Sequence, residues 1–272
     1  MTVSDLFHLA LAYLRRDLQT IKFLRWIAEW VDAALFTTIW YFVARLFSSD
    51  GRIPSGRSAD YFTFSLVGLA MSQYVWRGFA VFSDRLKSDQ MGQGFETLWV
   101  SAYPMPILVI FSGLWDFLAA TVNAGIILLM GTTLFGAQLQ WAGILSTMAV
   151  GLFTCLAMGS LGLLTSSWVI AWGGGSVAGQ LLNKAIPLVS GAFFPVSLFP
   201  WWLKALAWCF PLTHAITLSR GILIPSANVA MAQAWNALLI TTACFMGMGW
   251  WSLTFSLRLA RVNGRIAQGG ST

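Results

Sequence analysis

Six long apolar stretches, separated by shorter polar segments, recur along this chain of 272 residues. A helix needs about 20 mostly apolar residues to cross the hydrocarbon core of a bilayer. The stretches therefore predict six transmembrane helices within one all-α transmembrane domain that covers residues 1–272. These predicted spans lie at roughly 26–47, 61–82, 105–134, 141–170, 177–198 and 234–257.

The first 25 residues show a different pattern, with apolar residues at helical spacing and charged residues elsewhere on the helical wheel. Phe7, Leu11 and Leu18 share one face, and Arg16 lies opposite to it. We expect an amphipathic helix that lies on the cytoplasmic face of the membrane. The alternative is a helix that only anchors the chain on lipid.

The segment between the second and third predicted spans, residues 83–104, is polar in its first half and partly apolar afterwards. Phe95, Leu98 and Trp99 recur at helical spacing around Glu96. A short surface helix with one apolar face can dock a partner or pack on its own bundle. The pattern is compatible with both roles.

The apolar segment from residue 193 to residue 223 is divided by three prolines. If residues 199–223 crossed the bilayer as a seventh span, Lys204 and Arg220 would each cost about 2.5–3.5 kcal/mol. We expect instead two short helices, at about 200–209 and 212–223, that enter the outer leaflet and return. The tryptophans of this segment suit a membrane interface.

Composition and charge support a membrane protein and indicate its orientation. Hydrophobic residues make up 57% of the chain and charged residues only 10%, whereas soluble domains carry about 25% charged residues. Of the 16 Lys and Arg residues, nine fall on the side of the termini, four on the other side and three within the predicted spans. Positive charge collects on cytoplasmic loops, which predicts a cell-membrane protein with both termini in the cytoplasm.

Taken together, these patterns divide the chain into seven predicted parts. They are an interface helix (1–25), spans one and two (26–82), a loop (83–104), spans three to five (105–198), a re-entrant outer hairpin (199–233), span six (234–257) and a cytoplasmic tail (258–272).

The sequence lacks the motifs of several enzyme classes. It contains no Gly-Lys dipeptide, and hence no phosphate-binding loop of the GxxxxGK[ST] type, and neither HExxH nor GxSxG occurs. Its two histidines, His8 and His214, are far apart, and its three cysteines show no metal-ligand spacing. We therefore expect no catalytic residue, no metal site and no cofactor bound by this chain.

Ionisable residues inside predicted spans are candidates for function because charge is costly in a bilayer. Arg25, Glu29 and Asp32 lie one turn apart at the start of the first span, and Asp116 and Asn123 share one face of the third. Glu29, Asp32, Asp116 and Asn123 are the candidate residues of a polar path. The alternatives are an interfacial ion pair between Arg25 and Glu29, and helix packing for Asp116 and Asn123.

The order of these parts resembles the permeases of type-2 ABC exporters along essentially the whole chain. The segment SGAFFPVSLFPWWLKALAWCFPLTHAITLSR (190–220) is similar to the signature of that family, written SGxxFPxxxxP and followed by PLTH and an arginine. The matching positions are Ser190, Gly191, Phe194, Pro195, Pro200, Pro211, Leu212, Thr213, His214 and Arg220.

A second segment, GFETLWVSAYP (94–104), is similar to the GTxExLxxSP segment of the family. Glu96, Leu98 and Ser101 match this pattern. The Gly-Thr pair is replaced by Gln-Gly, and the proline, Pro104, comes two residues late.

The resemblance implies a permease subunit without its own ATPase site. Two copies of the chain, as a homodimer, would enclose the path of an amphiphilic substrate, and a separate ABC ATPase that binds ATP and Mg²⁺ would press on a coupling helix. The substrate would be a lipid-linked glycan, a polysaccharide, a lipo-oligosaccharide or a hydrophobic drug. The implied coupling residues are Phe95, Glu96, Leu98 and Trp99, and the implied outer gate consists of Pro195, Pro200, Trp201, Trp202, Pro211, His214 and Arg220.

Two other functions are weighed on the same sequence. A gradient-driven secondary transporter would need coupling-ion sites at mid-membrane and often has paired repeats, and the sequence offers only Asp116 for this role. A membrane-embedded transferase would need clustered acids, histidines or metal ligands at the water boundary, and the sequence shows no such cluster.

Overall fold

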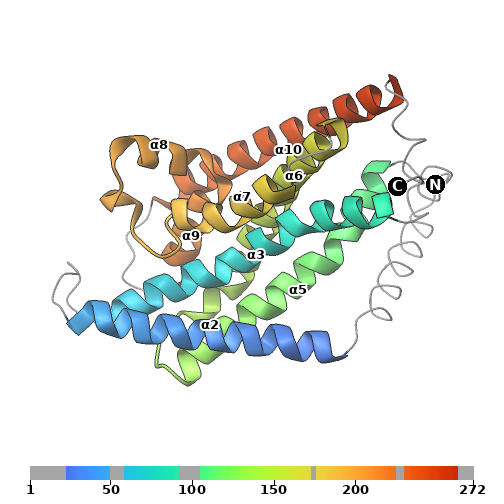
Figure 1. The fold of residues 1–272 in the computed structure, drawn as a ribbon. Helices are drawn as coiled ribbons and strands as arrows, with labels where there is room; N and C mark the ends of the chain where they lie inside the picture. Colours follow the sequence, from blue (N-terminus) through green and yellow to red (C-terminus); the bar gives the residue numbers. More distant parts are fainter. Residues whose placement is uncertain (1–22, 50–57, 92–104, 173–175, 225–229, 263–272) are drawn as a thin grey trace.

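The computed structural model describes residues 23–49, 58–91, 105–172, 176–224 and 230–262, and every regular element in these ranges is a helix (Figure 1). The predicted all-α class is thus confirmed for this part of the chain. The long helices are α2 (Phe23–Ser49), α3 (Ser58–Met91), α5 (Met105–Thr133), α6 (Ile144–Trp172) and α10 (Met231–Val262). The shorter ones are α7 (Ser176–Val189), α8 (Trp201–Cys209), α9 (Pro211–Leu223) and two 3₁₀ turns, η1 (Trp141–Gly143) and η2 (Val196–Leu198).

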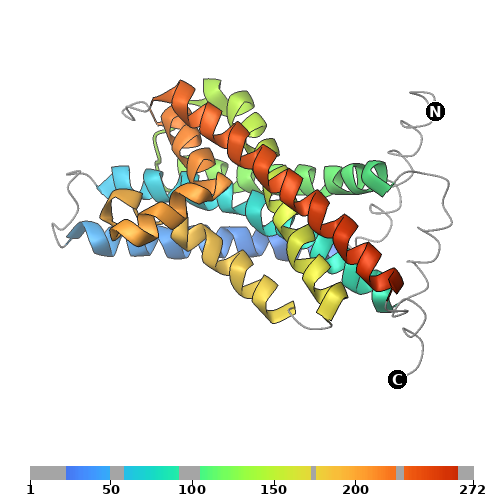
Figure 2. The ribbon, with the colours of Figure 1, turned by 90° about the horizontal axis from the view of Figure 1, so that it is seen from above.

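The long helices form a bundle, and α8 and α9 lie together at one end of it (left in Figure 1 and Figure 2). The start of α2 and the end of α10 lie at the opposite end of the bundle (right in both figures). The α8–α9 pair and these two helix ends are therefore separated by the length of the bundle.

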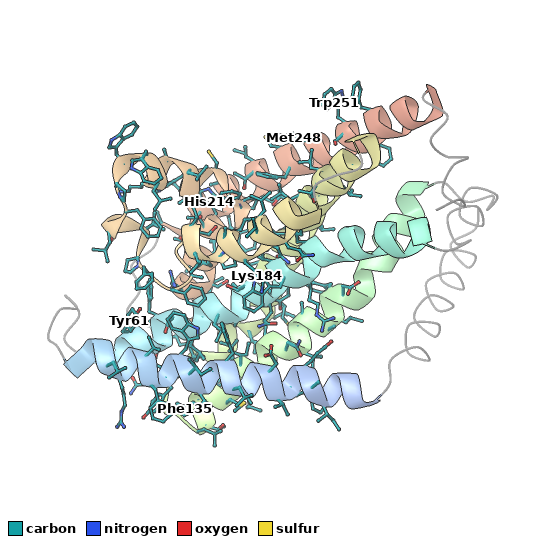
Figure 3. All side chains as sticks on the ribbon, in the orientation of Figure 1. Tyr61, Phe135, Lys184, His214, Met248 and Trp251 are labelled. Atoms are coloured by element: carbon teal, nitrogen blue, oxygen red, sulfur yellow. The ribbon has the colours of Figure 1, made fainter. Side chains whose placement is uncertain are left out.

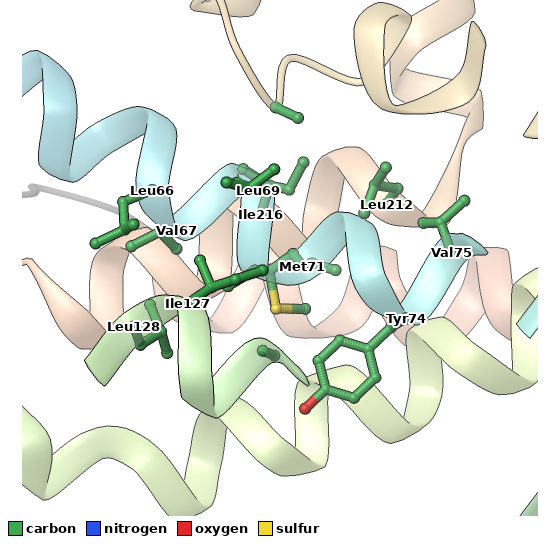
Figure 4. Packing of buried hydrophobic residues seen from close by; sticks show 14 of the residues in the cluster. Leu66, Val67, Leu69, Met71, Tyr74, Val75, Ile127, Leu128, Leu212 and Ile216 are labelled. Carbon is green, nitrogen blue, oxygen red and sulfur yellow. The ribbon is translucent and has the colours of Figure 1, made fainter. Parts of the chain in front are cut away.

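Helix α3 forms the centre of the bundle. It packs on α2, α5, α6, α7 and α9, and its side chains are buried from Tyr61 to Val75 with few exceptions. Figure 4 shows part of this core, where Met71 and Tyr74 of α3 lie near Ile127 of α5. Because protein surrounds α3 on most sides, this helix does not need the uniformly apolar surface of a lipid-facing helix.

The polar side chains buried in α3 bond to their own helix. The Ser65 hydroxyl donates to the carbonyl of Tyr61 at 3.0 Å, and the Ser72 hydroxyl donates to that of Gly68 at 2.8 Å. A buried hydroxyl costs little once its hydrogen bond is made. These serines are therefore compatible with the core.

The backbones of α3 and α6 touch where glycines remove the side chain. A Cβ atom at Gly78 would lie 2.7 Å from the carbonyl oxygen of Cys155, and one at Gly162 would lie 2.5 Å from that of Phe79. Both distances are shorter than any real contact of a Cβ atom. Small residues allow this close approach of helices in membranes.

Three segments of the described helices are long and apolar enough to cross a bilayer, judged by length and composition. They are Ile27–Leu46 in α2, Asp116–Thr133 in α5 and Trp141–Thr165 in η1 and α6. These segments fall within the first, third and fourth predicted spans. This finding does not test the other three of the six predicted spans.

The fifth predicted span, 177–198, requires a correction because α7 ends at Val189. The chain then turns at Gly191, where φ is +82°. At about 1.5 Å per residue, the 14 residues of α7 reach about 21 Å, which is less than the roughly 30 Å of a bilayer core. Helix α7 alone does not span a bilayer.

Two further boundaries also differ from the prediction. Helix α3 continues to Met91, so that the first part of the predicted loop 83–104 is helical. Helix α10 continues to Val262, beyond the predicted end of the sixth span at residue 257. In both places the helix extends past the apolar stretch into more polar sequence, where hydropathy marks no helix end.

Candidate functional site

The turn after α7, residues 190–194 (SGAFF), is the first part of the candidate site. Gly191 occupies the left-handed region with φ of +82°, which glycine adopts without steric cost. The carbonyl groups of Gly191, Ala192 and Phe193 follow the end of the helix and need donors from elsewhere. Side chains of two other helices supply these donors.

Arg220 of α9 is the main donor to this turn. Its Nη1 donates to the carbonyl of Gly191 at 3.0 Å, its Nη2 to that of Ala192 at 2.8 Å, and its Nε to that of Phe64 in α3 at 3.1 Å. We call these three bonds the Arg220 clamp. They join α9, α3 and the turn after α7, which are distant in the sequence.

The Arg220 clamp is buried, because only 9% of Arg220 is exposed. The centre of its guanidinium group lies 3.3 Å from the centroid of the Phe64 ring, where the face of the ring attracts a cation. The planar fork of arginine can serve several acceptors at fixed angles, and hydrogen bonds from a charged donor are stronger than neutral ones. Carbonyl dipoles and an aromatic face thus surround this buried charge.

The last residues of the turn are held by α2 and α3. The Tyr61 hydroxyl donates to the carbonyl of Phe193 at 3.1 Å. The ring of Trp40 stacks on the ring of Phe193, with 4.2 Å between centroids and 9° between planes. A Cβ atom at Gly68 would collide with the backbone of Ala192, so α3 and the turn are in direct backbone contact.

The PLTH residues join α8 to α9. The Thr213 hydroxyl donates to the carbonyl of Ala207 at 2.6 Å, and Nε2 of His214 donates to that of Trp208 at 3.0 Å. These carbonyls belong to the last turn of α8, where the regular helical hydrogen bonds end, and that of Ala207 also accepts from the N–H of Phe210 at 3.1 Å. Pro211 is the first residue of α9, a position where proline loses no hydrogen bond.

Helices α8 and α9 differ in burial. Most of α9 is buried against α3, α6 and α10, and Figure 3 shows His214 of α9 and Tyr61 of α3 toward the same end of the molecule. By contrast, α8 packs on α7, α9 and η2, and among the described residues it has no comparable contact with another helix. Trp201 is 83% exposed, and Trp202, Lys204 and Trp208 are exposed as well. Helix α8 therefore presents an aromatic outer face.

The structure brings some of the predicted gate residues together and separates others. Arg220 lies in the clamp and His214 in the α8–α9 junction, whereas Pro195 and Pro200 precede η2 and α8. Trp201 and Trp202 lie on the outer face of α8 and make no part of the clamp.

Sequence reasoning missed the residues of α2 and α3 that contact Arg220 or the turn after α7. Trp40, Tyr61, Phe64 and Gly68 lie within predicted spans, where aromatic and small residues are common. A tyrosine within an apolar stretch is a weak signal that a buried acceptor lies nearby. Nothing in the local pattern identifies Phe193 as that acceptor.

The candidate polar-path residues lie on α2 and α5. Glu29 forms an ion pair with Arg77 of α3, which the sequence did not predict. The side chain of its predicted partner, Arg25, is not among those that the structure describes. Asp32 is exposed, Asp116 is half-buried, and Asn123 is only 4% exposed. In the described part of the chain, Oδ1 of Asn123 has no hydrogen-bond partner. A polar path through these residues stays a prediction.

The other predicted sites fall outside the residues that the structure describes. These are the interface helix up to residue 22 and the coupling residues Phe95, Glu96, Leu98 and Trp99. Where the structure is described, no group of three or more His, Cys, Asp and Glu residues could hold a metal ion.

A comparison with family models covers most of the chain. Residues 10–224 match the family model described as ABC-2 type transporter. The match covers most of the chain and reaches the end of α9, so it includes the Arg220 clamp and the α8–α9 junction. No curated protein matches the chain.

Proposed function

Because the chain belongs to the ABC-2 type transporter family, we propose that it is the permease subunit of an ATP-driven exporter of an amphiphilic substrate. The family comprises the membrane parts of ABC transporters, which lack the ATPase site. ATP and Mg²⁺ would then bind to a separate ABC ATPase, and a second copy of this chain would complete the substrate path. The substrate class would be a lipid-linked glycan, a lipo-oligosaccharide or a hydrophobic drug.

In this proposal the chain crosses the cell membrane six times, with both termini in the cytoplasm. The start of α2 and the end of α10 lie at one end of the bundle, which supports placing both on the same side of the membrane. The α8–α9 pair lies at the other end and would face the outer leaflet. Helix α7 and the turn after it would form a fifth span that is completed by the hairpin.

The observation that carries the proposal is the Arg220 clamp. It fastens the α8–α9 pair to α3 through the carbonyl of Phe64. Helix α3 runs without a break from the clamp to Met91, and the proposed coupling residues around Glu96 follow a few residues later. A rigid helix would therefore connect the coupling segment to the outer gate.

The proposed mechanism follows from this connection. Closure of two ATPases on ATP would press on the coupling segment and tilt α3. Because the clamp ties α9 and the turn after α7 to α3, the hairpin would move with α3 and open the outer end of the path. Polar contacts with the substrate would come from Glu29, Asp32, Asp116 and Asn123 if these residues line the path.

Purification from the native host in mild detergent tests the proposal. We expect an ABC ATPase to co-purify with the chain, and Glu96→Lys to weaken this association without preventing membrane insertion. Vesicles that contain both subunits should move the substrate only with ATP. The absence of any ATPase together with the absence of ATP-dependent transport would refute the proposal. Lipid and glycan analysis of a deletion strain would then identify the substrate class.

Cysteine labelling tests the topology separately. Lys204→Cys, in a background in which Cys155, Cys209 and Cys244 are replaced, should react with a membrane-impermeant reagent added outside the cell. The native cysteines must be removed because Cys209 and Cys244 are exposed. Labelling that requires permeabilised cells would reverse the proposed orientation.

A further inference from the structure

A cavity of about 120 Å³ lies between α3, α5 and α6. Its lining includes Met71 and Tyr74 of α3, Gly125 of α5, Met148 of α6 and Leu223 of α9. We call it the α5–α6 cavity. Its volume is below the roughly 300–1,000 Å³ of typical small-molecule sites, so it suits one end of a chain rather than a whole lipid or drug.

The lining of the α5–α6 cavity contains three hydroxyl groups, but it offers an occupant no free hydroxyl hydrogen. The Tyr74 hydroxyl donates to Thr121 at 3.2 Å, the Thr121 hydroxyl to the carbonyl of Phe117 at 2.8 Å, and the Thr147 hydroxyl to the carbonyl of Gly143 at 3.1 Å. All three hydrogens are thus used within the protein. An occupant needs no polar group here, and a polar one would lose its own hydrogen bonds.

The cavity is only partly enclosed, and both α5 and α6 contribute to its lining. Both helices contain a segment apolar enough to span a membrane. Helix α5 packs mainly on α3, and α6 packs on α3 and α10, whereas α5 and α6 contact each other much less. Leu129 of α5 and Leu145 of α6 are exposed. A gap between two such helices faces hydrocarbon, and an unfilled apolar wall would lose its dispersion contacts.

We infer that the α5–α6 cavity binds the end of one acyl chain of a membrane phospholipid, from the leaflet that surrounds the α8–α9 end of the bundle. The position of the cavity supports this leaflet, because Leu128 near the end of α5 and Ile144 at the start of α6 line it. The inference depends on the membrane location of the chain and not on ATP, a partner or transport.

The bound chain would also contact the helices that carry the Arg220 clamp. Val67 lines the cavity, and the adjacent Gly68 touches the turn at Ala192. Leu223 lines the cavity three residues after Arg220 on α9. Lipid in the α5–α6 cavity would therefore stabilise the position of α9 relative to α3.

Two glycines provide a matched pair of variants for a test. A Cβ atom at Gly125 or at Gly247 would meet nothing within 4 Å, so the first side-chain carbon fits at both positions. Gly125→Leu fills the cavity, whereas Gly247→Leu adds the same side chain on α10, away from it. Met148→Ala enlarges the cavity and acts in the opposite direction.

The full chain would be reconstituted in nanodiscs of phosphatidylcholine with a photoactivatable diazirine near the end of one acyl chain, and the labelled residues mapped by mass spectrometry. We expect labelling of the buried lining residues Met71 and Val67, loss of most of this label in Gly125→Leu, its retention in Gly247→Leu, and an increase in Met148→Ala. Labelling of exposed Leu145 without any label on Met71 or Val67 would overturn the inference. An unchanged label in Gly125→Leu would do the same. Neither result bears on the proposed transport function, because no ATPase is present.

Discussion

Arg220 and Phe64 lie 156 positions apart in the sequence, yet they make two contacts. Nε of Arg220 donates to the carbonyl of Phe64 at 3.1 Å, and the guanidinium group lies over the ring of the same residue at 3.3 Å. One arginine thereby joins the hairpin helix α9 to the central helix α3. The other two bonds of its fork hold the turn after α7.

Loss of the clamp should lower both stability and transport. Arg220→Ala removes the donor to the turn carbonyls of Gly191 and Ala192, and each unpaired buried group costs about 1–3 kcal/mol. The carbonyl of Phe64 also loses its bond to Arg220 but lies within helix α3. Arg220→Lys should be an intermediate case, because an ammonium group keeps the charge but cannot match the planar fork. Thermal unfolding of the purified variants and transport in vesicles would measure these effects. Arg45→Ala, at an exposed position on α2, is the control and should have little effect. Equal stability of Arg220→Ala and the parent chain would contradict the structural role of the clamp.

Gly68 is predicted to tolerate no side chain. The new methyl group in Gly68→Ala would collide with the backbone of Ala192, which cannot swing aside as a flexible side chain would. We expect a lower melting temperature and impaired transport, although alanine favours a helix by about 0.5–1 kcal/mol over glycine. Gly247→Ala enters open space on α10 and should be neutral or slightly stabilising. A Gly68→Ala variant as stable as Gly247→Ala would show that α3 and the turn separate without cost.

The junction between α8 and α9 leads to a local prediction. His214→Ala and Thr213→Val each remove a side-chain donor to the end of α8, a bond worth about 0.5–1.5 kcal/mol. Because α8 has few other contacts, its amide hydrogens should exchange faster, whereas those of the well-packed α9 should change little. Hydrogen exchange followed by mass spectrometry of residues 201–223 would resolve the two helices. A uniform increase across both helices would instead indicate that the hairpin unfolds as one unit.

Much of the helical pattern could be predicted from the sequence, because hydropathy reports how much of a helix faces lipid. The stretches at 26–47, 105–134 and 141–170 contain the three segments that are apolar enough to span a bilayer. The end of α7 could not be predicted in this way. Residues 190–194 are as apolar as a helix in lipid, but Gly191 turns the chain, and the long-range bonds from Arg220 and Tyr61 make that turn favourable.

Only the residues of the proline-containing motif could be predicted as part of the candidate site. The prolines, His214 and Arg220 belong to a local motif, so a resemblance to a family could identify them. Their acceptors include the carbonyl of Phe64 and those of the turn, and a backbone carbonyl carries no signal of its own in the sequence. The pairing of Glu29 with Arg77 likewise depends on how α2 packs on α3.

The ion pair between Glu29 and Arg77 should couple α2 to α3. Their side chains are 24% and 20% exposed, respectively, so water screens the pair only in part. A double-mutant cycle with Glu29→Gln and Arg77→Met should give a coupling energy of about 0.5–3 kcal/mol in thermal or denaturant unfolding. The reversed pair, Glu29→Arg with Arg77→Glu, should recover part of the stability that either reversal loses alone. Strict additivity of the two single variants would mean that the pair contributes no net stability.

The proposed connection through α3 leads to the last prediction. From Phe64 in the clamp to Met91, α3 extends about 40 Å at about 1.5 Å per residue, and Ser83 lies within this helical stretch. Glycine at this position weakens a helix by about 1 kcal/mol relative to alanine, so Ser83→Gly should make α3 more flexible between the coupling segment and the clamp. We expect the ATPase to bind and hydrolyse ATP as before while transport per ATP falls. Ser83→Ala, which stiffens the helix, should keep the two activities coupled. If Ser83→Gly and the stronger breaker Ser83→Pro both insert normally and transport at the parental ratio, the outer gate does not respond through α3.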